Sequence, residues 1–115
     1  MRTIVAGCRN ITNYETVEAA IAASGFSSQI TTIISGGECG VDSCGEWYAT
    51  KNKIPLEIHQ AEWDVHGRYA GPKRNKAMAK IADALIAVWD GESRGTANMI
   101  NEAQLKGLKV YVHML

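Results

Sequence analysis

The chain has 115 residues, an apolar fraction of 46% and a formal net charge of zero, from 12 basic and 12 acidic side chains. The length suits one domain, residues 1–115, and the composition is that of an ordinary soluble globular protein. Because duplex nucleic acid and anionic membrane surfaces both favour clustered positive charge, we expect neither as a partner. A small anionic ligand needs only a local arrangement of donors and stays open.

The cellular location is inferred from signals that the chain lacks. It contains no signal-peptide core and no apolar run long enough to cross a bilayer, and three cysteines are too few for a disulfide scaffold. We therefore expect a cytoplasmic protein. Cys39 and Cys44 have no second cysteine or histidine pair to complete a metal set, and Cys8 has no obvious base beside it. No metal, cofactor or cysteine nucleophile is expected.

The first half of the chain alternates short apolar runs with helical segments. β-Branched runs that end in glycine or serine predict buried strands, and apolar residues three and four positions apart predict a helix. The expected elements are a strand at Thr3–Gly7, a helix from a capping box of Thr12 and Glu15 to about Ser24, a strand at Ile30–Ser35, a glycine turn at Gly36–Gly40 and a helix at Val41–Lys51.

The second half repeats this alternation after a longer irregular segment. Residues 60–70 show neither strand nor helix periodicity, and loops of that length often carry function. Proline suits the first turn of a helix, and glycine suits the end of one. We expect a brief strand after Pro55, a helix from Gly71 to about Ala82, a strand at Ala84–Trp89, a polar turn at Asp90–Gly95, a helix from Thr96 to about Gly107 and a strand at Lys109–His113.

This order of elements predicts an α/β fold, a doubly wound parallel sheet of about five strands with helices on both faces. Right-handed crossovers make 3-2-1-4-5 the expected strand order, with a switch point between the first and fourth strands. Ligands in such sheets bind beyond the carboxyl ends of the strands at that point. The three polar, glycine-rich turns that begin at Gly7, Ser35 and Asp90 are expected to converge there.

The turn after the fourth strand is the strongest candidate for an anion site. A strand that runs straight into a helix leaves backbone N–H groups unpaired beside the positive end of the helix dipole. Arg94 adds a planar cation that can hold a phosphate with two bonds. We expect a ligand to contact Asp90, Ser93, Arg94, Gly95 and Thr96.

The turn after the second strand is expected to form another wall of the same pocket. Ser35, Gly36, Gly37 and Gly40 let the backbone approach a phosphate closely, although they suit a tight strand-to-helix turn equally without a ligand. The loop matches neither a Walker A motif nor the dinucleotide-binding fingerprint. Asp42, in the first turn of the next helix, either favours the helix dipole or receives a ribose hydroxyl.

Basic and aromatic residues gather around the start of the third long helix. The basic and amide side chains are either solvated or contact phosphate at this helix start. The aromatic rings either stack on a base or pack in the core or a lid. These candidates are Trp63, Arg68, Tyr69, Gly71, Arg74 and Asn75.

Four motifs together resemble a known family. They are Gly7-x-Arg9, Ser35-Gly36-Gly37-x-x-Gly40-Val41-Asp42, Trp63-Asp64-x-x-Gly67-Arg68-x-x-Gly71-Pro72-x-Arg74-Asn75 and Ser93-x-Gly95-Thr96-Ala97. Their order and spacing resemble the YspA-like branch of the SLOG superfamily. The resemblance implies a Rossmann-like fold, a nucleotide or nucleotide-derived small molecule as ligand, and a homodimer or higher homo-oligomer. It adds Gly7, Arg9 and Asp64 to the candidate ligand-binding residues.

The resemblance extends to LOG-type phosphoribohydrolases, which release a base from a nucleoside monophosphate. Arg74 and Gly95-Thr96 match their motif, but the lysine position holds Asn75 and the glutamate position holds Met99. Methionine can neither handle a proton nor stabilise positive charge on the sugar, which argues against this hydrolase activity. A nucleotide N-glycosidase, the alternative, would need an acid from among Glu38, Asp42, Asp64 and Glu102.

SLOG domains of Thoeris-type bacterial antiviral systems sense cyclic ADP-ribose derivatives. By resemblance, the chain suits a carrier or a phage anti-defence sponge that sequesters such a signalling nucleotide. We therefore expect it to bind a phosphate-bearing, nucleotide-derived small molecule without turnover. A third hypothesis is an assembly module with a vestigial pocket. Met78, Ile81 and Met99 either form exposed helix faces that suit a dimer or join the core.

Overall fold

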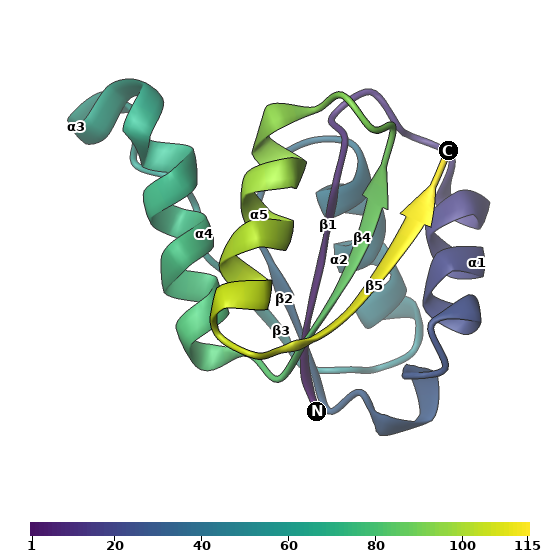
Figure 1. Cartoon of the computed structure of the whole chain (residues 1–115). Coiled ribbons are helices and arrows are strands. Elements are labelled where there is room, and N and C mark those ends of the chain that lie inside the picture. Colours follow the sequence, from purple (N-terminus) through teal and green to yellow (C-terminus); the bar gives the residue numbers. More distant parts are fainter.

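The computed structural model describes residues 1–115 and contains one sheet of five parallel strands. The strand order is β3-β2-β1-β4-β5, so the doubly wound topology predicted from the sequence is confirmed (Figure 1). The central strand β1 pairs with β2 on one side and with β4 on the other. The strands are β1 Arg2–Gly7, β2 Thr32–Ser35, β3 Leu56–Ile58, β4 Ala84–Trp89 and β5 Lys109–Met114.

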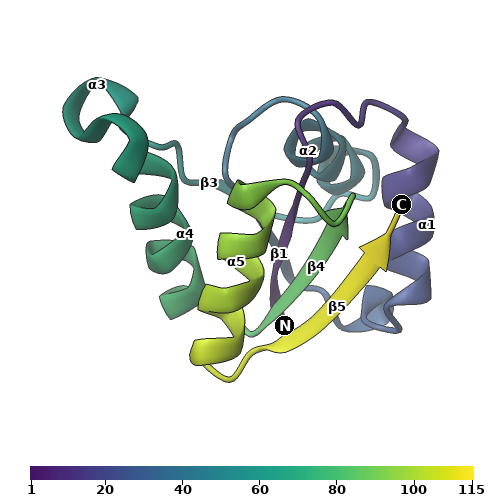
Figure 2. The ribbon, with the colours of Figure 1, turned by 45° about the horizontal axis from the view of Figure 1, so that its top comes forward.

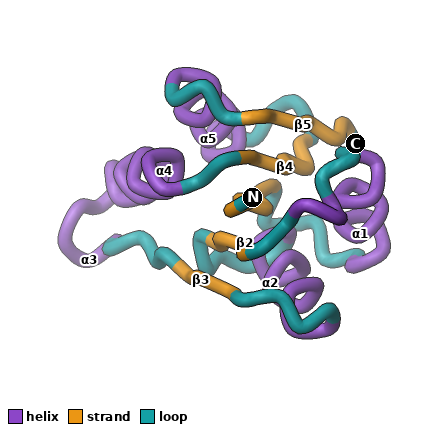
Figure 3. Tube along the Cα trace, turned by 90° about the horizontal axis from the view of Figure 1, so that it is seen from below, coloured by secondary structure: helices purple, strands orange, loops and turns teal.

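Helices cover both faces of this sheet. Figures 2 and 3 show α1 and α2 on one face and α4 and α5 on the other, while α3 projects from the body before the start of α4. No helix combines the length and the apolar character that a membrane span requires. The helices are α1 Tyr14–Ala23, α2 Val41–Lys51, α3 Trp63–His66, α4 Ala70–Ile81 and α5 Arg94–Leu105.

The hydrophobic core lies on both faces because the central strands are apolar at consecutive positions. Successive side chains of a strand point to opposite faces, so neighbours such as Ile4 and Val5 enter different layers. Val5 and Ile86 pack with residues of α1 and α2, whereas Ile4 and Leu85 pack with residues of α4 and α5. All four are fully buried. Unbroken apolar runs are therefore what a sheet covered on both faces requires.

The methionines of α4 and α5 belong to this core. Met78 and Met99 are each 1% exposed and pack with Ile4 and Leu85. The sequence left open whether these residues form an exposed helix face or join the core. Both methionines join the core, because α4 and α5 lie against each other on the sheet. Ile81 is 39% exposed and is the member of the set that reaches the surface.

Some element boundaries differ from those predicted. Asn13, not Thr12, caps α1, and its side chain accepts a hydrogen bond at 2.9 Å from the N–H two residues on. Helix α5 begins at Arg94 rather than at Thr96, because the Ser93 side chain takes the cap position. The segment predicted to be irregular contains α3, whose single turn is too short to show helical periodicity.

Candidate functional site

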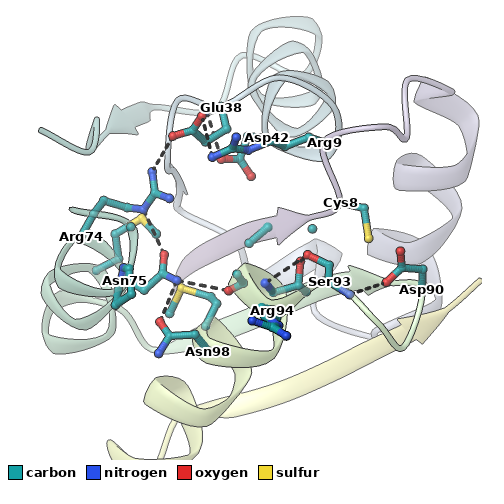
Figure 4. A pocket seen from close by; sticks show the side chains of 18 of the residues that line it. Cys8, Arg9, Glu38, Asp42, Arg74, Asn75, Asp90, Ser93, Arg94 and Asn98 are labelled. Atoms are coloured by element: carbon teal, nitrogen blue, oxygen red, sulfur yellow. Dashed lines mark hydrogen bonds and ion pairs between the residues drawn. The ribbon is translucent and has the colours of Figure 1, made fainter. Parts of the chain in front are cut away.

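A cavity of about 630 Å³ opens at the carboxyl ends of β1 and β4, where the strand order reverses (Figure 4). The first turns of α4 and α5 and the loops after β1 and β2 complete its walls. The lining comprises 21 residues, of which 5 are hydrophobic. The polar crevice predicted at the switch point of the sheet is therefore present.

Most of the candidate residues chosen from the sequence line this cavity. They come from separate segments of the chain, which the fold brings to one place. In chain order they are Gly7, Arg9, Asp42, Trp63, Arg68, Gly71, Arg74, Asn75, Asp90, Ser93, Arg94, Gly95 and Thr96.

The other candidates lie outside the lining. At the end of β2, the Ser35 hydroxyl donates to Glu46 at 2.6 Å and accepts a hydrogen bond from the Gly37 N–H at 3.1 Å. The Ser35 hydroxyl thus serves the turn and α2. The residues outside the lining are Ser35, Gly36, Gly37, Gly40, Asp64 and Tyr69.

The first turn of α5 presents unpaired backbone donors to the cavity. The Ser93 side chain caps the helix by accepting a hydrogen bond from the Thr96 N–H at 3.5 Å. The N–H groups of Arg94 and Gly95 make no hydrogen bond within the protein. A Cβ built on Gly95 meets no atom within 4 Å, so the space in front of this backbone is open. This combination is the physical basis of an anion site at a helix start.

Asp90 shapes the loop that leads into α5. Its Oδ1 accepts hydrogen bonds from the N–H groups of Glu92 and Ser93, each at 2.8 Å. These bonds, that from Ser93 first, lower the pKa of Asp90 below its ordinary value. The carboxylate is therefore ionised at neutral pH and is used to order the loop. Positive potential at this wall comes from the Arg94 side chain and the helix start.

Arg74 joins two walls of the cavity. Its Nη1 donates to the Gly36 carbonyl oxygen at 2.6 Å, and its Nε donates to Asn75 Oδ1 at 2.9 Å. Asn75 Nδ2 donates in turn to the Gly95 carbonyl oxygen at 3.3 Å and to Asn98 Oδ1 at 3.0 Å. Arg74 thus ties α4 to the loop after β2 and, through Asn75, to α5. The sequence predicts a phosphate contact for Arg74, and the structure shows these contacts within the protein instead.

Asp42 is a buried carboxyl group with a perturbed titration. The residue is 5% exposed, and its Oδ2 accepts a hydrogen bond from the Glu38 N–H at 3.2 Å. Burial raises the pKa of Asp42 to about 6, and the Glu38 N–H and the Arg74 guanidinium offset only part of that effect. A carboxyl group that titrates near neutral pH can accept a hydrogen bond from a ligand or hold a proton beside it.

We expect Asp42 to lower the free energy of unfolding by about 2–3 kcal/mol as the pH rises from 4 to 7. Its pKa is about 6 in the folded chain against an ordinary value of 3.8. Within that window the folded state binds more protons than the unfolded state, so stability present at low pH is lost as the pH rises through the folded value. Urea denaturation of the wild type and of Asp42→Asn across this range measures the difference. If the free energy of unfolding depends on pH in the same way in both proteins, the prediction is contradicted.

The lining also contains residues that were not predicted as ligand contacts. Met78 follows Arg74 by four positions, and Asn98 and Met99 follow Gly95 by three and four, a helical spacing that indicates a shared face. The sequence suggested Glu38 only as one of the candidate acids of an N-glycosidase, the alternative function. The unpredicted lining residues are Ala6, Cys8, Asn10, Glu38, Pro72, Met78, Asn98 and Met99.

Two of the four candidate acids for an N-glycosidase reach the cavity. Glu38 and Asp42 line it, whereas Asp64 and Glu102 do not. Met99 lines it at the position that the LOG-type motif assigns to glutamate. Histidine, cysteine and carboxylate side chains form no cluster that could hold a metal ion.

Residues 1–66 match the family described as the YspA, cpYpsA-related SLOG family. The Gene 61 protein of Mycobacterium phage D29 is 31% identical over 116 residues, which cover 95% of this chain and 93% of that protein. The chain belongs to the YspA, cpYpsA-related SLOG family. The family match ends at α3, and the similarity to the phage protein continues along nearly the whole SLOG chain.

The fold of this SLOG protein is shared with DNA processing protein A (DprA) from Streptococcus pneumoniae. The two superpose with a TM-score of 0.73 at 18% identity, over 96% of this chain and 49% of that one. The chain therefore spans about half the length of the DprA chain. At this identity the likeness establishes the Rossmann-like α/β fold. Membership of the SLOG family itself indicates nucleotide-related binding or processing.

Proposed function

We propose that this SLOG protein binds a phosphate-bearing, nucleotide-derived small molecule in the cavity without turning it over. The first turn of α5 carries the proposal, since two unpaired N–H groups, the Arg94 side chain and open space at Gly95 meet there. The cavity volume of about 630 Å³ is in the range of small-molecule sites. We place the phosphate of the ligand at this helix start.

The other polar groups of the cavity suit the sugar and the base of a nucleotide. The carboxylates of Glu38 and Asp42 can accept hydrogen bonds from ribose hydroxyls, and the Trp63 ring offers a stacking surface for a base. Arg9 already lies over this ring, 5.6 Å from its centroid. A partly buried helix-start contact contributes up to about 2 kcal/mol. Together with the Arg94 contact, the hydrogen bonds to the sugar and base stacking, it would give micromolar affinity, about −8 kcal/mol, after ordering costs.

A nucleotide N-glycosidase is the second candidate, and the titration of Asp42 favours it. A pKa of about 6 lets this carboxyl group hold a proton near neutral pH, as a general acid requires. Met99 argues for binding instead, because a thioether at the position of the LOG-type glutamate can neither transfer a proton nor stabilise a developing positive charge. The two candidates differ in their products. A glycosidase releases free base, whereas a binding protein returns the nucleotide intact.

The role we propose for such binding is sequestration of a signalling nucleotide, such as a cyclic ADP-ribose derivative. The resemblance to SLOG sensor domains supports this role, and so does the similarity to a protein of a bacteriophage. We also propose that the protein acts in the cytoplasm as a homodimer. Leu105 and Val65, which are 72% and 68% exposed, are available for self-association. If the cavity binds nothing, an assembly module is the remaining hypothesis.

Arg94→Gln is expected to weaken ADP binding about tenfold, because it removes a charged bond to phosphate and leaves the helix start in place. Lys106→Gln is the matched control, since it removes the same charge at the opposite end of α5. Isothermal titration calorimetry with AMP and ADP measures the affinities. Chromatography of the same mixtures after incubation detects free base.

These measurements separate the candidate functions. If Arg94→Gln binds ADP with the affinity of the wild type, the phosphate does not lie at the start of α5. Free base appearing with the wild type would favour the glycosidase over the binding protein. A wild type that binds neither AMP nor ADP would contradict the ligand class proposed here.

A further inference from the structure

The carboxylate of Glu38 connects four segments around the cavity. Its Oε1 lies 3.4 Å from Arg9 Nη2, and its Oε2 lies 3.5 Å from Arg74 Nη1. Oε2 also accepts a hydrogen bond from Trp63 Nε1 at 3.2 Å. The loops after β1 and β2, helix α3 and helix α4 thus meet at one acidic group. The Glu38 and Arg74 side chains are 22% and 11% exposed, so solvent screens their interaction less than it screens a surface pair.

The two sides of the cavity differ in what they offer to a ligand. Figure 4 shows Glu38 and Asp42 together on one side, with Ser93 and Arg94 on the other. Arg94 makes no ion pair and lies beside the unpaired N–H groups of α5. On the Glu38 side, Arg9 and Arg74 both face its carboxylate already, and Asp42 adds a second acidic group, whereas Arg68, which also lines the cavity, makes no ion pair. Beside Glu38 and Asp42 the cavity therefore offers acceptors for hydroxyl or amine donors.

We propose that Glu38 determines the charge specificity of the cavity. By occupying Arg9 and Arg74, its carboxylate restricts the site to ligands with one anionic end, held at α5, and excludes a phosphate from the opposite side. This inference rests on the proposed function and specifies its ligand class. A nucleoside 5′-diphosphate fits, because its phosphates are contiguous. A nucleoside 3′,5′-bisphosphate does not, because its second phosphate would meet the carboxylates of Glu38 and Asp42.

ADP and adenosine 3′,5′-bisphosphate test the proposal, because they share base, sugar and number of phosphates and differ in where the phosphates stand. We expect the wild type to bind ADP at least about tenfold more tightly than the bisphosphate. Glu38→Gln keeps an acceptor for Trp63 but releases Arg9 and Arg74. It should raise the affinity for the bisphosphate about tenfold relative to the affinity for ADP, with both affinities measured by titration calorimetry.

Two further variants control for charge and for mechanism. Glu62→Gln removes the same charge next to Trp63 without a contact to either arginine, and it should change neither affinity. The double variant Arg9→Gln/Glu38→Gln should bind the bisphosphate more weakly than Glu38→Gln alone, because one of the two released arginines is then absent.

The outcomes distinguish this inference from the proposed function. A wild type that binds the bisphosphate as tightly as ADP overturns the inference whatever the variants do. The inference is also overturned if Glu38→Gln has the circular dichroism spectrum of the wild type but gains no affinity for the bisphosphate. Equal gains in affinity for both nucleotides would overturn it as well. In those cases binding of ADP to the wild type leaves the proposed function standing. If the wild type and Glu38→Gln bind neither nucleotide, the proposed function fails for this ligand class, and the inference fails with it.

Discussion

Replacing Gly95 by aspartate is expected to lower the affinity for ADP about a thousandfold while the protein stays folded. The Cβ at this position points into open space, and the backbone of Gly95 is not in the left-handed region, so the residue fits. A carboxylate in the first turn of a helix interacts favourably with the helix dipole. It would occupy the unpaired N–H groups and repel the phosphate that we place there.

Gly95→Asn is the matched control for this prediction, because asparagine has the shape of aspartate without its charge. We expect it to lose only about tenfold in affinity, from partial filling of the site. Thermal unfolding of both variants should occur at or above the wild-type midpoint. If Gly95→Asp binds ADP as tightly as Gly95→Asn, then charge at the start of α5 does not matter, and the phosphate lies elsewhere in the cavity.

Gly40→Ala is expected to lower the free energy of unfolding by about 4 kcal/mol. Gly40 has a φ of +79°, which is unfavourable for residues with a side chain. A Cβ here would also lie 2.4 Å from the carbonyl oxygens of both Cys8 and Arg9. These backbone atoms cannot retreat freely, because the Val41 N–H donates to the Cys8 carbonyl oxygen at 3.1 Å. The free-energy costs of backbone strain and of the steric clash therefore add.

Gly25→Ala separates these two contributions. Gly25 has a φ of +78°, but a Cβ there meets no atom within 4 Å. Its substitution should cost about 1–2 kcal/mol, from the backbone conformation alone. Urea denaturation of both variants gives the comparison. Equal losses at the two positions would show that the loop after β1 can move away from α2, in which case the wall that carries Arg9 is not rigidly held.

Gly40 and Gly95 illustrate how similar motifs acquire different roles. Both stand in glycine-rich turns that follow strands, and both are predicted from the sequence to let a ligand approach the backbone. In the folded chain Gly40 is packed against the loop after β1, whereas Gly95 faces open space in the cavity lining. The first glycine is required by contacts within the protein. The second leaves room for a ligand.

Local patterns in the sequence were sufficient to predict the fold and the place of the cavity. The unbroken apolar run Ala84–Trp89 predicts a strand buried on both faces, and the alternation of such runs with helices of a dozen residues predicts the strand order 3-2-1-4-5. Once that order is known, the carboxyl ends of β1 and β4 must be neighbours. The polar turns after them therefore had to meet, whatever their side chains do in detail.

Only the tertiary structure decided which side chains of those turns face the cavity and which serve the protein. Arg74 donates to the Gly36 carbonyl oxygen across 38 positions of the chain, and Trp63 donates to Glu38 across 25. Periodicity reports the face on which a residue lies but not its partner on another segment. Such partners depend on how α4 and the loop after β2 are placed against each other. This is why Glu38, an ordinary loop residue in the sequence, becomes the acidic group at which Arg9, Trp63 and Arg74 meet.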